Sequence, residues 1–287
     1  MTVEERISAA EQKLAPMFAQ IDKIALLNQE KVLRAFREER IALRHFAATT
    51  GYGYGDEGRD ALGRVYARAF GAERAVVSPA LLSGTHALTV ALFGILRPGD
   101  RVLCVSGTPY DTLRGVVWGK GNGSLSDFGI AFDTVPLDEN GKVDCPAVRE
   151  RLRAGGYRMV YLQRSRGYEL RDSFTVDEIG KVCSCVRGSG FSGCIFVDNC
   201  YGEFVEEREP TEVGADLIVG SLIKNPGGGL APIGGYIAGK KECVENAAYR
   251  LTSPGLGKEV GASLGILKDF YQGFFLAPTV TAGALKG

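Results

Sequence analysis

The stretch ADLIVGSLIKNPGGGLAPIGGYIAGK (residues 215–240) decides how the chain folds. An apolar run leads to a single lysine, Lys224, and a glycine-rich loop then leads to a second short apolar run. Short apolar runs separated by glycine and proline indicate buried strands joined by a loop. A lysine taken alone is most often solvated, but a lysine directly after a buried strand gains little unless it has a partner. Because burial lowers the pKa of a lysine, we expect Lys224 to be nucleophilic toward carbonyls.

Strands and helices alternate on the N-terminal side of this stretch. A helix is expected to begin at SGTHAL (83–88), and another begins at Thr175, where Glu178 completes a capping box. Repeated βαβ units predict an α/β fold with a mainly parallel sheet covered by helices on both faces. Ligands of such sheets bind beyond the carboxyl ends of the strands. The predicted strands are RAVVSP, DRVLCVS, RMVYLQRS, GCIFVDN and ADLIVGSLIK, with AFDTVPL extended.

The N-terminal region has a different sequence pattern from the alternating strands and helices. Residues 3–46 carry apolar residues at helical spacing, and Pro16 is expected to break them into two helices. The glycine-rich TTGYGYGDEGRD (49–60) predicts a loop. We therefore divide the chain into an N-terminal helical segment, residues 1–48, and a large domain, residues 49–287.

The composition is that of an ordinary globular protein. Lys+Arg and Asp+Glu both total 34, so no excess of positive charge favours a nucleic-acid or membrane partner. The N-terminus MTVEERISAAEQ lacks the apolar core of a signal peptide, which favours the cytoplasm. Seven scattered cysteines without a CxxC pair favour reduced thiols over a metal site. With only two histidines and no GxSxG, a serine-hydrolase triad is disfavoured.

Polar residues gather where the predicted strands end. Asp198 follows GCIFV, although an acid there is more often a helix cap or a loop residue. Ser83 and Thr85 open a helix and suit a phosphate, although they also suit an ordinary cap, and Ser221 adds a hydroxyl. A lysine, an acid and a phosphate cradle fit pyridoxal 5′-phosphate, whose ring accepts electrons from a carbanion. The glycines after Lys224 are expected to let the backbone approach this cofactor.

Several long motifs are similar to those of one family. GYGYGDEGRDAL, SGTHAL, PYDTL, QRSRGY, FVDNCYGEFVEEREPTEVGADL and GSLIKNPGGGLAPIGGYIAGK together resemble the aluminium-resistance-protein family. This family is also described as methionine gamma-lyase-like and is related to the fold-type-I enzymes of cysteine and methionine metabolism that use pyridoxal phosphate. The resemblance runs from about residue 50 to the end. It implies that residues 49–287 are a cofactor-binding large domain of that fold.

The resemblance implies roles for individual residues. Lys224 matches the Schiff-base lysine, Asp198 matches the partner of the pyridinium nitrogen, and Tyr110 matches the aromatic residue that stacks on the cofactor. Tyr110 also suits a core position at a helix start. Wider relatives carry a hydroxyl before the lysine where Ile223 stands here, which implies an altered phosphate shell. The expected phosphate ligands are Ser83, Gly84, Thr85 and Ser221.

Other expected contacts lie further from the lysine. Tyr52, Tyr54 and Arg59 occupy positions from which related enzymes reach the phosphate and substrate of a partner subunit, so a homodimer or homotetramer is expected. Gln163 and Arg164 end a strand and are expected to contact the cofactor's phenolic oxygen or the substrate.

The resemblance implies a lyase that acts on a sulfur-containing or related amino acid. Lys224 would exchange its Schiff base with the substrate and remove the α-proton, and a β- or γ-substituent would leave. Relatives carry a C-terminal small domain with a carboxylate-binding arginine, and we expect that domain to be missing here. An alternative is therefore a protein that binds pyridoxal phosphate in metal or stress tolerance with little turnover. A nucleotide-binding α/β protein is disfavoured, because GxGxxG and GxxxxGK[ST] do not occur.

Overall fold

A seven-stranded sheet forms the centre of the computed structural model, which describes residues 1–287. The strand order is β1-β7-β6-β5-β4-β2-β3. All neighbouring pairs are parallel except those made by β7, which runs antiparallel to both β1 and β6. The predicted, mainly parallel α/β sheet is confirmed. The strands are β1 (Arg74–Ser78), β2 (Arg101–Cys104), β3 (Ala131–Thr134), β4 (Met159–Gln163), β5 (Cys194–Asp198), β6 (Leu217–Ser221) and β7 (Gly235–Gly239).

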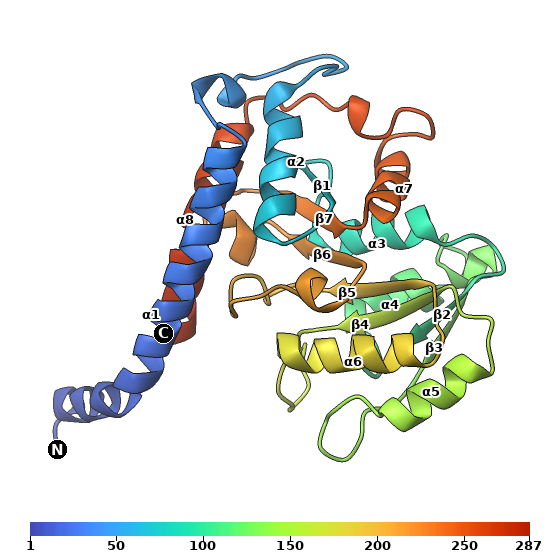
Figure 1. The fold of residues 1–287 in the computed structure, drawn as a ribbon, viewed down its shortest axis with the longest axis horizontal. Helices are drawn as coiled ribbons and strands as arrows, with labels where there is room; N and C mark the ends of the chain where they lie inside the picture. Colours follow the sequence, from blue (N-terminus) through green and yellow to red (C-terminus); the bar gives the residue numbers. More distant parts are fainter.

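Helices cover both faces of the sheet (Figure 1). The helices are α1 (Val3–Glu38), α2 (Glu57–Ala69), α3 (Gly84–Ile95), α4 (Asp111–Trp118), α5 (Cys145–Arg153), α6 (Val176–Gly188), α7 (Lys241–Leu251) and α8 (Leu267–Lys286). Short 3₁₀ turns are η1 (Leu43–Phe46), η2 (Ser126–Phe128), η3 (Pro210–Val213), η4 (Asn225–Gly227) and η5 (Gly257–Glu259). No helix is long and apolar enough to cross a membrane.

Alternate residues of each strand enter two separate cores, as the two-residue repeat of a strand requires. In β4, Val160 and Leu162 join the core under α2, α5, α6 and α8, whereas Met159 and Tyr161 join the core under α3, α4 and α7. All five residues of β4, β5, β6 and β7 are buried. Near-continuous apolar runs therefore mark these strands because both of their faces are covered.

The N-terminal helix differs from the prediction. Pro16 lies inside one continuous helix, α1, and does not divide it. The first seventeen residues are exposed, so water can bond the one carbonyl that the proline leaves without a donor. Helix α1 ends at Glu38, earlier than predicted, and packs along α8 (Figure 1) through the ring of Phe36, which lies edge-on to Tyr271 and Phe275.

Helix α2 begins earlier than predicted. The predicted loop ends at Asp56, whose carboxylate accepts a hydrogen bond from the Arg59 N–H at 2.8 Å and caps the helix. The capping box of Thr175 and Glu178 is confirmed at the start of α6.

Candidate active site

The Lys224 amine lies beyond the carboxyl end of β6, which stops at Ser221. Its Nζ atom is 4.1 Å from the centre of the Tyr201 ring, and the Cys200 side chain acts to raise its pKa. On its other side lies the first residue of α3, because a Cβ atom built on Gly84 would be 3.7 Å from Nζ. The lysine amine therefore lies where the end of β6, the turn after β5 and the start of α3 meet.

Asp198 ends β5, the parallel neighbour of β6, and its side chain is almost fully buried. Its carboxylate accepts bonds from the Cys200 N–H at 3.1 Å and the Tyr161 hydroxyl at 3.5 Å. Burial raises the pKa of Asp198, and the Cys200 N–H and the charge of Lys224 only partly oppose this shift. The predicted pairing of Asp198 and Lys224 at one sheet edge is present in the structure.

The electrostatics of Lys224 differ from the prediction. Burial acts to lower its pKa, but the neighbouring Cys200 sulfur and Asp198 carboxylate act in the opposite direction. The net direction of the pKa is upward, so the amine is protonated at neutral pH before any ligand binds. The prediction that burial alone makes this lysine nucleophilic is wrong, because it left out the neighbours that the fold supplies.

The start of α3 lies beside the lysine and has free backbone N–H groups. Ser83 caps the helix and accepts the His86 N–H at 3.1 Å, which leaves the N–H groups of Gly84 and Thr85 ahead of the first intrahelical bond. Below them, the Ser221 hydroxyl is buried and has no hydrogen-bond partner. A Cβ atom on Gly84 would lie 3.4 Å from Ser221 Cβ, so the missing side chain keeps this space open.

Tyr110 and Gln163 lie at the same edge of the sheet as the start of α3. The Tyr110 hydroxyl lies 3.0 Å from the Thr85 hydroxyl, which also lies 3.2 Å from that of Thr112. The Gln163 side chain accepts the Tyr110 N–H at 3.0 Å and donates to the Ser165 carbonyl at 3.0 Å. Gln163 therefore fixes the start of α4, and with it the Tyr110 ring, relative to β4.

Arg164 does not join these residues. Its guanidinium donates to Asn199 at 2.8 Å and Glu206 at 2.7 Å, and it lies in a buried cluster with Glu209. The expectation that Arg164 contacts cofactor or substrate is not supported, because its donors are already used inside the protein.

The glycines after Lys224 allow close packing of the backbone, whereas their predicted approach to a cofactor stays a prediction. A Cβ atom on Gly227 would lie 1.6 Å from the Leu222 carbonyl oxygen, and one on Gly228 would lie 2.1 Å from the Gly273 carbonyl oxygen of α8. Gly228 also has a positive φ of 55°. The glycines therefore allow the lysine loop to fold on itself and to pack against α8.

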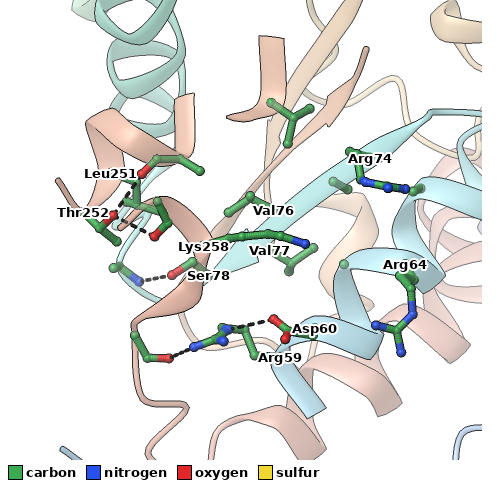
Figure 2. A pocket seen from close by; sticks show the side chains of 18 of the residues that line it. Arg59, Asp60, Arg64, Arg74, Val76, Val77, Ser78, Leu251, Thr252 and Lys258 are labelled. Carbon is green, nitrogen blue, oxygen red and sulfur yellow. Dashed lines mark hydrogen bonds and ion pairs between the residues drawn. The ribbon is translucent and has the colours of Figure 1, made fainter. Parts of the chain in front are cut away.

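Tyr52, Tyr54 and Arg59 lie apart from Lys224 within one chain. The two tyrosine rings are exposed and lie against each other, with centres 5.8 Å apart. Arg59 lines a cavity of about 470 Å³ between α2, β1 and α7 and pairs with Asp60 there (Figure 2). It also donates to the Gly53 carbonyl at 2.8 Å, so it holds the loop that carries the tyrosines. Their reach into a partner subunit stays a prediction.

Three residues of the site were not predicted from the sequence. Cys200 and Tyr201 contact the amine, and Asn225 bonds the turn that carries them. Cys200 and Tyr201 lie two and three residues after the strand-end acid, and Asn225 follows the lysine, so closeness in the chain to those two residues was the available signal.

A comparison with protein families covers nearly the whole chain. The family model for methionine gamma-lyase matches residues 3–287. The chain belongs to the methionine gamma-lyase family.

The chain is similar to several known proteins. YnbB, an uncharacterised protein of Bacillus subtilis, is 49% identical over 96% of this chain. A Listeria monocytogenes structure, described as a candidate cystathionine beta-lyase involved in aluminium resistance, is 52% identical with a TM-score of 0.97 over 99% of this chain. L-methionine gamma-lyase of Pseudomonas putida is 29% identical to this chain. The matched region is 64% of this chain and 41% of the Pseudomonas protein. This chain spans 66% of the length of YnbB and 70% of the Listeria chain.

Proposed function

We propose that this protein is a pyridoxal-phosphate-dependent carbon–sulfur lyase acting on a sulfur-containing or related amino acid. The observation that carries the proposal is the meeting of the Lys224 amine, the buried Asp198 and the start of α3 at one sheet edge. Membership of the family supports the lyase class, and the Listeria and Pseudomonas relatives support carbon–sulfur chemistry.

The residues present fit the cofactor. The free N–H groups of Gly84 and Thr85 and the unpartnered Ser221 hydroxyl would hold its phosphate, and Lys224 would hold its aldehyde carbon. Tyr110 would lie against its ring, and Asp198 would bond the ring nitrogen. When bound, pyridoxal phosphate supplies an electron sink for a carbanion at the substrate α-carbon.

The side chains of the site would position and move protons. Lys224 Nζ, once it has lost its own proton, would accept the α-proton of the substrate as a general base. The carboxylate of Asp198 would stabilise the protonated, positively charged ring nitrogen. It is buried and is held in place by a hydrogen bond from the Cys200 N–H. The Tyr110 hydroxyl, bonded to Thr85, would fix the ring that covers the cofactor. Loss of a β- or γ-substituent would follow.

We further propose a cytoplasmic homodimer or homotetramer in which Tyr54 and Arg59 reach the site of a partner subunit. The exposed rings of Tyr52 and Tyr54 support this proposal. Neither a nucleic acid nor a membrane is proposed as a partner.

A second candidate is a protein that binds pyridoxal phosphate in stress or metal tolerance without turnover. Its cofactor contacts would be the same as those of the lyase, because both candidates use Lys224, Asp198 and the start of α3 to bind pyridoxal phosphate. Keto-acid release from cysteine, cystathionine or methionine separates the two candidates. Release from any of the three supports the lyase, whereas cofactor binding without release supports the second candidate.

The test of the cofactor site uses the visible spectrum of the chain with added pyridoxal phosphate, followed by borohydride reduction and peptide mass mapping. We expect a band that disappears on reduction and a mass label on Lys224. Lys224→Ala is expected to lose both the band and the label. Lys258→Ala is the matched control, since Lys258 lines the separate cavity of Figure 2. A label that survives Lys224→Ala would refute the assignment.

A further inference from the structure

The turn after β5 contains an unusual backbone. Tyr201 has φ of 69° and Phe204 has φ of 61°, the left-handed region that residues other than glycine rarely adopt. Phe204 is buried in the core, but the Tyr201 side chain is 61% exposed. Burial of apolar surface therefore does not account for the conformation of Tyr201. Such strain persists where the surrounding structure imposes it, and it often marks a functional site.

The Asn225 side chain is what imposes it here. Its amide nitrogen donates to the Tyr201 carbonyl at 3.1 Å and to the Glu203 carbonyl at 2.9 Å, so both of its N–H groups bond this turn. Within the turn, the Gly202 N–H donates to the Asn199 carbonyl at 2.8 Å. Asn225 directly follows Lys224, so the residue that holds the turn is covalently tied to the lysine.

The result of this arrangement is contact with the amine. The face of the Tyr201 ring lies 4.1 Å from Lys224 Nζ, within the range of a cation–π contact. The adjacent Cys200 side chain acts to raise the pKa of the same amine, and Asp198 and Glu203 are the acidic groups that act on it from the same strand and turn.

We propose that the Cys200–Phe204 turn is built to hold the Lys224 amine, with Tyr201 as the ring on which it rests and Asn225 as the positioning residue that fixes the turn. The inference rests on the proposed function only in taking Lys224 as the reactive amine. It accounts for the strained backbone of an exposed tyrosine, since the ring face lies against the amine in this conformation.

The test uses the cofactor-free chain and measures how labelling of Lys224 by formaldehyde and cyanoborohydride depends on pH, with peptide mass spectrometry as the readout. Tyr201→Gly is expected to move the labelling midpoint to lower pH by on the order of half a unit, because the ring no longer stabilises the ammonium. Its melting temperature is not expected to fall, since glycine adopts a positive φ freely. Asn225→Ala is expected to shift the midpoint in the same direction. Tyr201→Phe keeps the ring but loses the phenol that also acts to raise the pKa of Lys224, so it is expected to shift the midpoint less than Tyr201→Gly.

Arg40→Gly is the matched control, because Arg40 is an exposed residue with φ of 51° that lies in the turn after α1. It is expected to leave the midpoint unchanged. An unchanged midpoint in Tyr201→Gly and Asn225→Ala would overturn the inference, as would a loss of stability in Tyr201→Gly without a shift. Cofactor attachment at Lys224 is measured separately on the wild type, so failure of the proposed function would be seen there.

Discussion

Ser221 and Glu203 are two buried residues with polar atoms that the protein itself does not satisfy. Both lie next to the lysine segment, since Ser221 is three residues before Lys224 and the Glu203 carbonyl bonds Asn225. Leaving a buried polar atom without a partner costs about 1–3 kcal/mol, so such atoms point to a ligand or to an unusual protonation state.

Ser221→Ala is predicted to leave the free energy of unfolding unchanged or to raise it slightly, because the hydroxyl has no partner to lose. The same variant is predicted to bind pyridoxal phosphate about tenfold more weakly, since it lacks one bond to a charged phosphate. Urea unfolding and a spectroscopic titration measure the two effects. Equal affinity in variant and wild type would show that Ser221 is not a phosphate ligand.

Glu203 makes the stability of the fold depend on pH. Burial, and to a lesser degree Glu209, raises its pKa from 4.5 to about 8, although Tyr236 donates a hydrogen bond at 2.8 Å. Between these values the folded state keeps a proton that the unfolded state has released. The contribution of Glu203 to stability is therefore lost as pH rises through this window, by at most about 1.4 kcal/mol per unit.

Glu203→Gln, which is neutral at every pH, is predicted to lose less stability than the wild type between pH 5 and pH 8. Urea unfolding at several pH values across this window measures the difference. Glu39→Gln is the control, since Arg64 and Arg68 hold the pKa of Glu39 low despite its partial burial. Parallel curves for wild type and Glu203→Gln would show that Glu203 is ionised in the folded protein.

Helix α8 determines where the lysine loop lies. The backbones of the two segments touch, because a Cβ atom on Gly273 would be 2.2 Å from the Gly227 carbonyl oxygen. The Tyr66 ring stacks on Phe274 with centres 3.8 Å apart, and its hydroxyl donates to the Pro226 carbonyl at 3.2 Å. Helices α2 and α8 together therefore fix the segment that follows Lys224.

Gly273→Ala is predicted to destabilise the protein by on the order of 3 kcal/mol, because neither backbone can move away easily. Gly283→Ala in the same helix is the matched comparison, since nothing lies within 4 Å of its Cβ position. It is predicted to stabilise the protein by about 0.5–1 kcal/mol through helix propensity. Thermal unfolding measures both, and equal effects of the two changes would contradict the close contact.

For the molecule as a whole, the sequence predicted the sheet but not the contacts made by its loops. Lys224 and Asp198 were placed together because the carboxyl ends of parallel strands share one edge, and Thr175 was identified as a cap from local chemistry. Tyr201 and the raised pKa of Lys224 were missed, since both depend on how a turn folds back in space. The antiparallel β7 and the helices after it also lay beyond what strand and helix alternation predicts.

The proposed homodimer leads to a prediction about mixed chains. Lys224→Ala lacks the reactive amine, and Tyr54→Ala lacks the ring expected to reach the partner, so each variant alone is predicted to be inactive. A refolded equimolar mixture is predicted to regain about a quarter of the wild-type keto-acid release, because half of the dimers are then mixed and each holds one complete site. Activity of Tyr54→Ala alone, or no recovery in the mixture, would contradict a shared site.

The order of the strands also bears on how this protein is made. The first strand in the chain, β1, has β7 as its only neighbour in the sheet, and β7 is the last strand to be synthesised. A nascent chain on the ribosome therefore carries β1 with both edges unpaired until Gly239 has emerged, and β6 with one edge unpaired. The strand that bears Ser221 is thus enclosed only after β7 has been synthesised, so a chain interrupted before Gly239 would expose the unfinished cradle to chaperones and proteases.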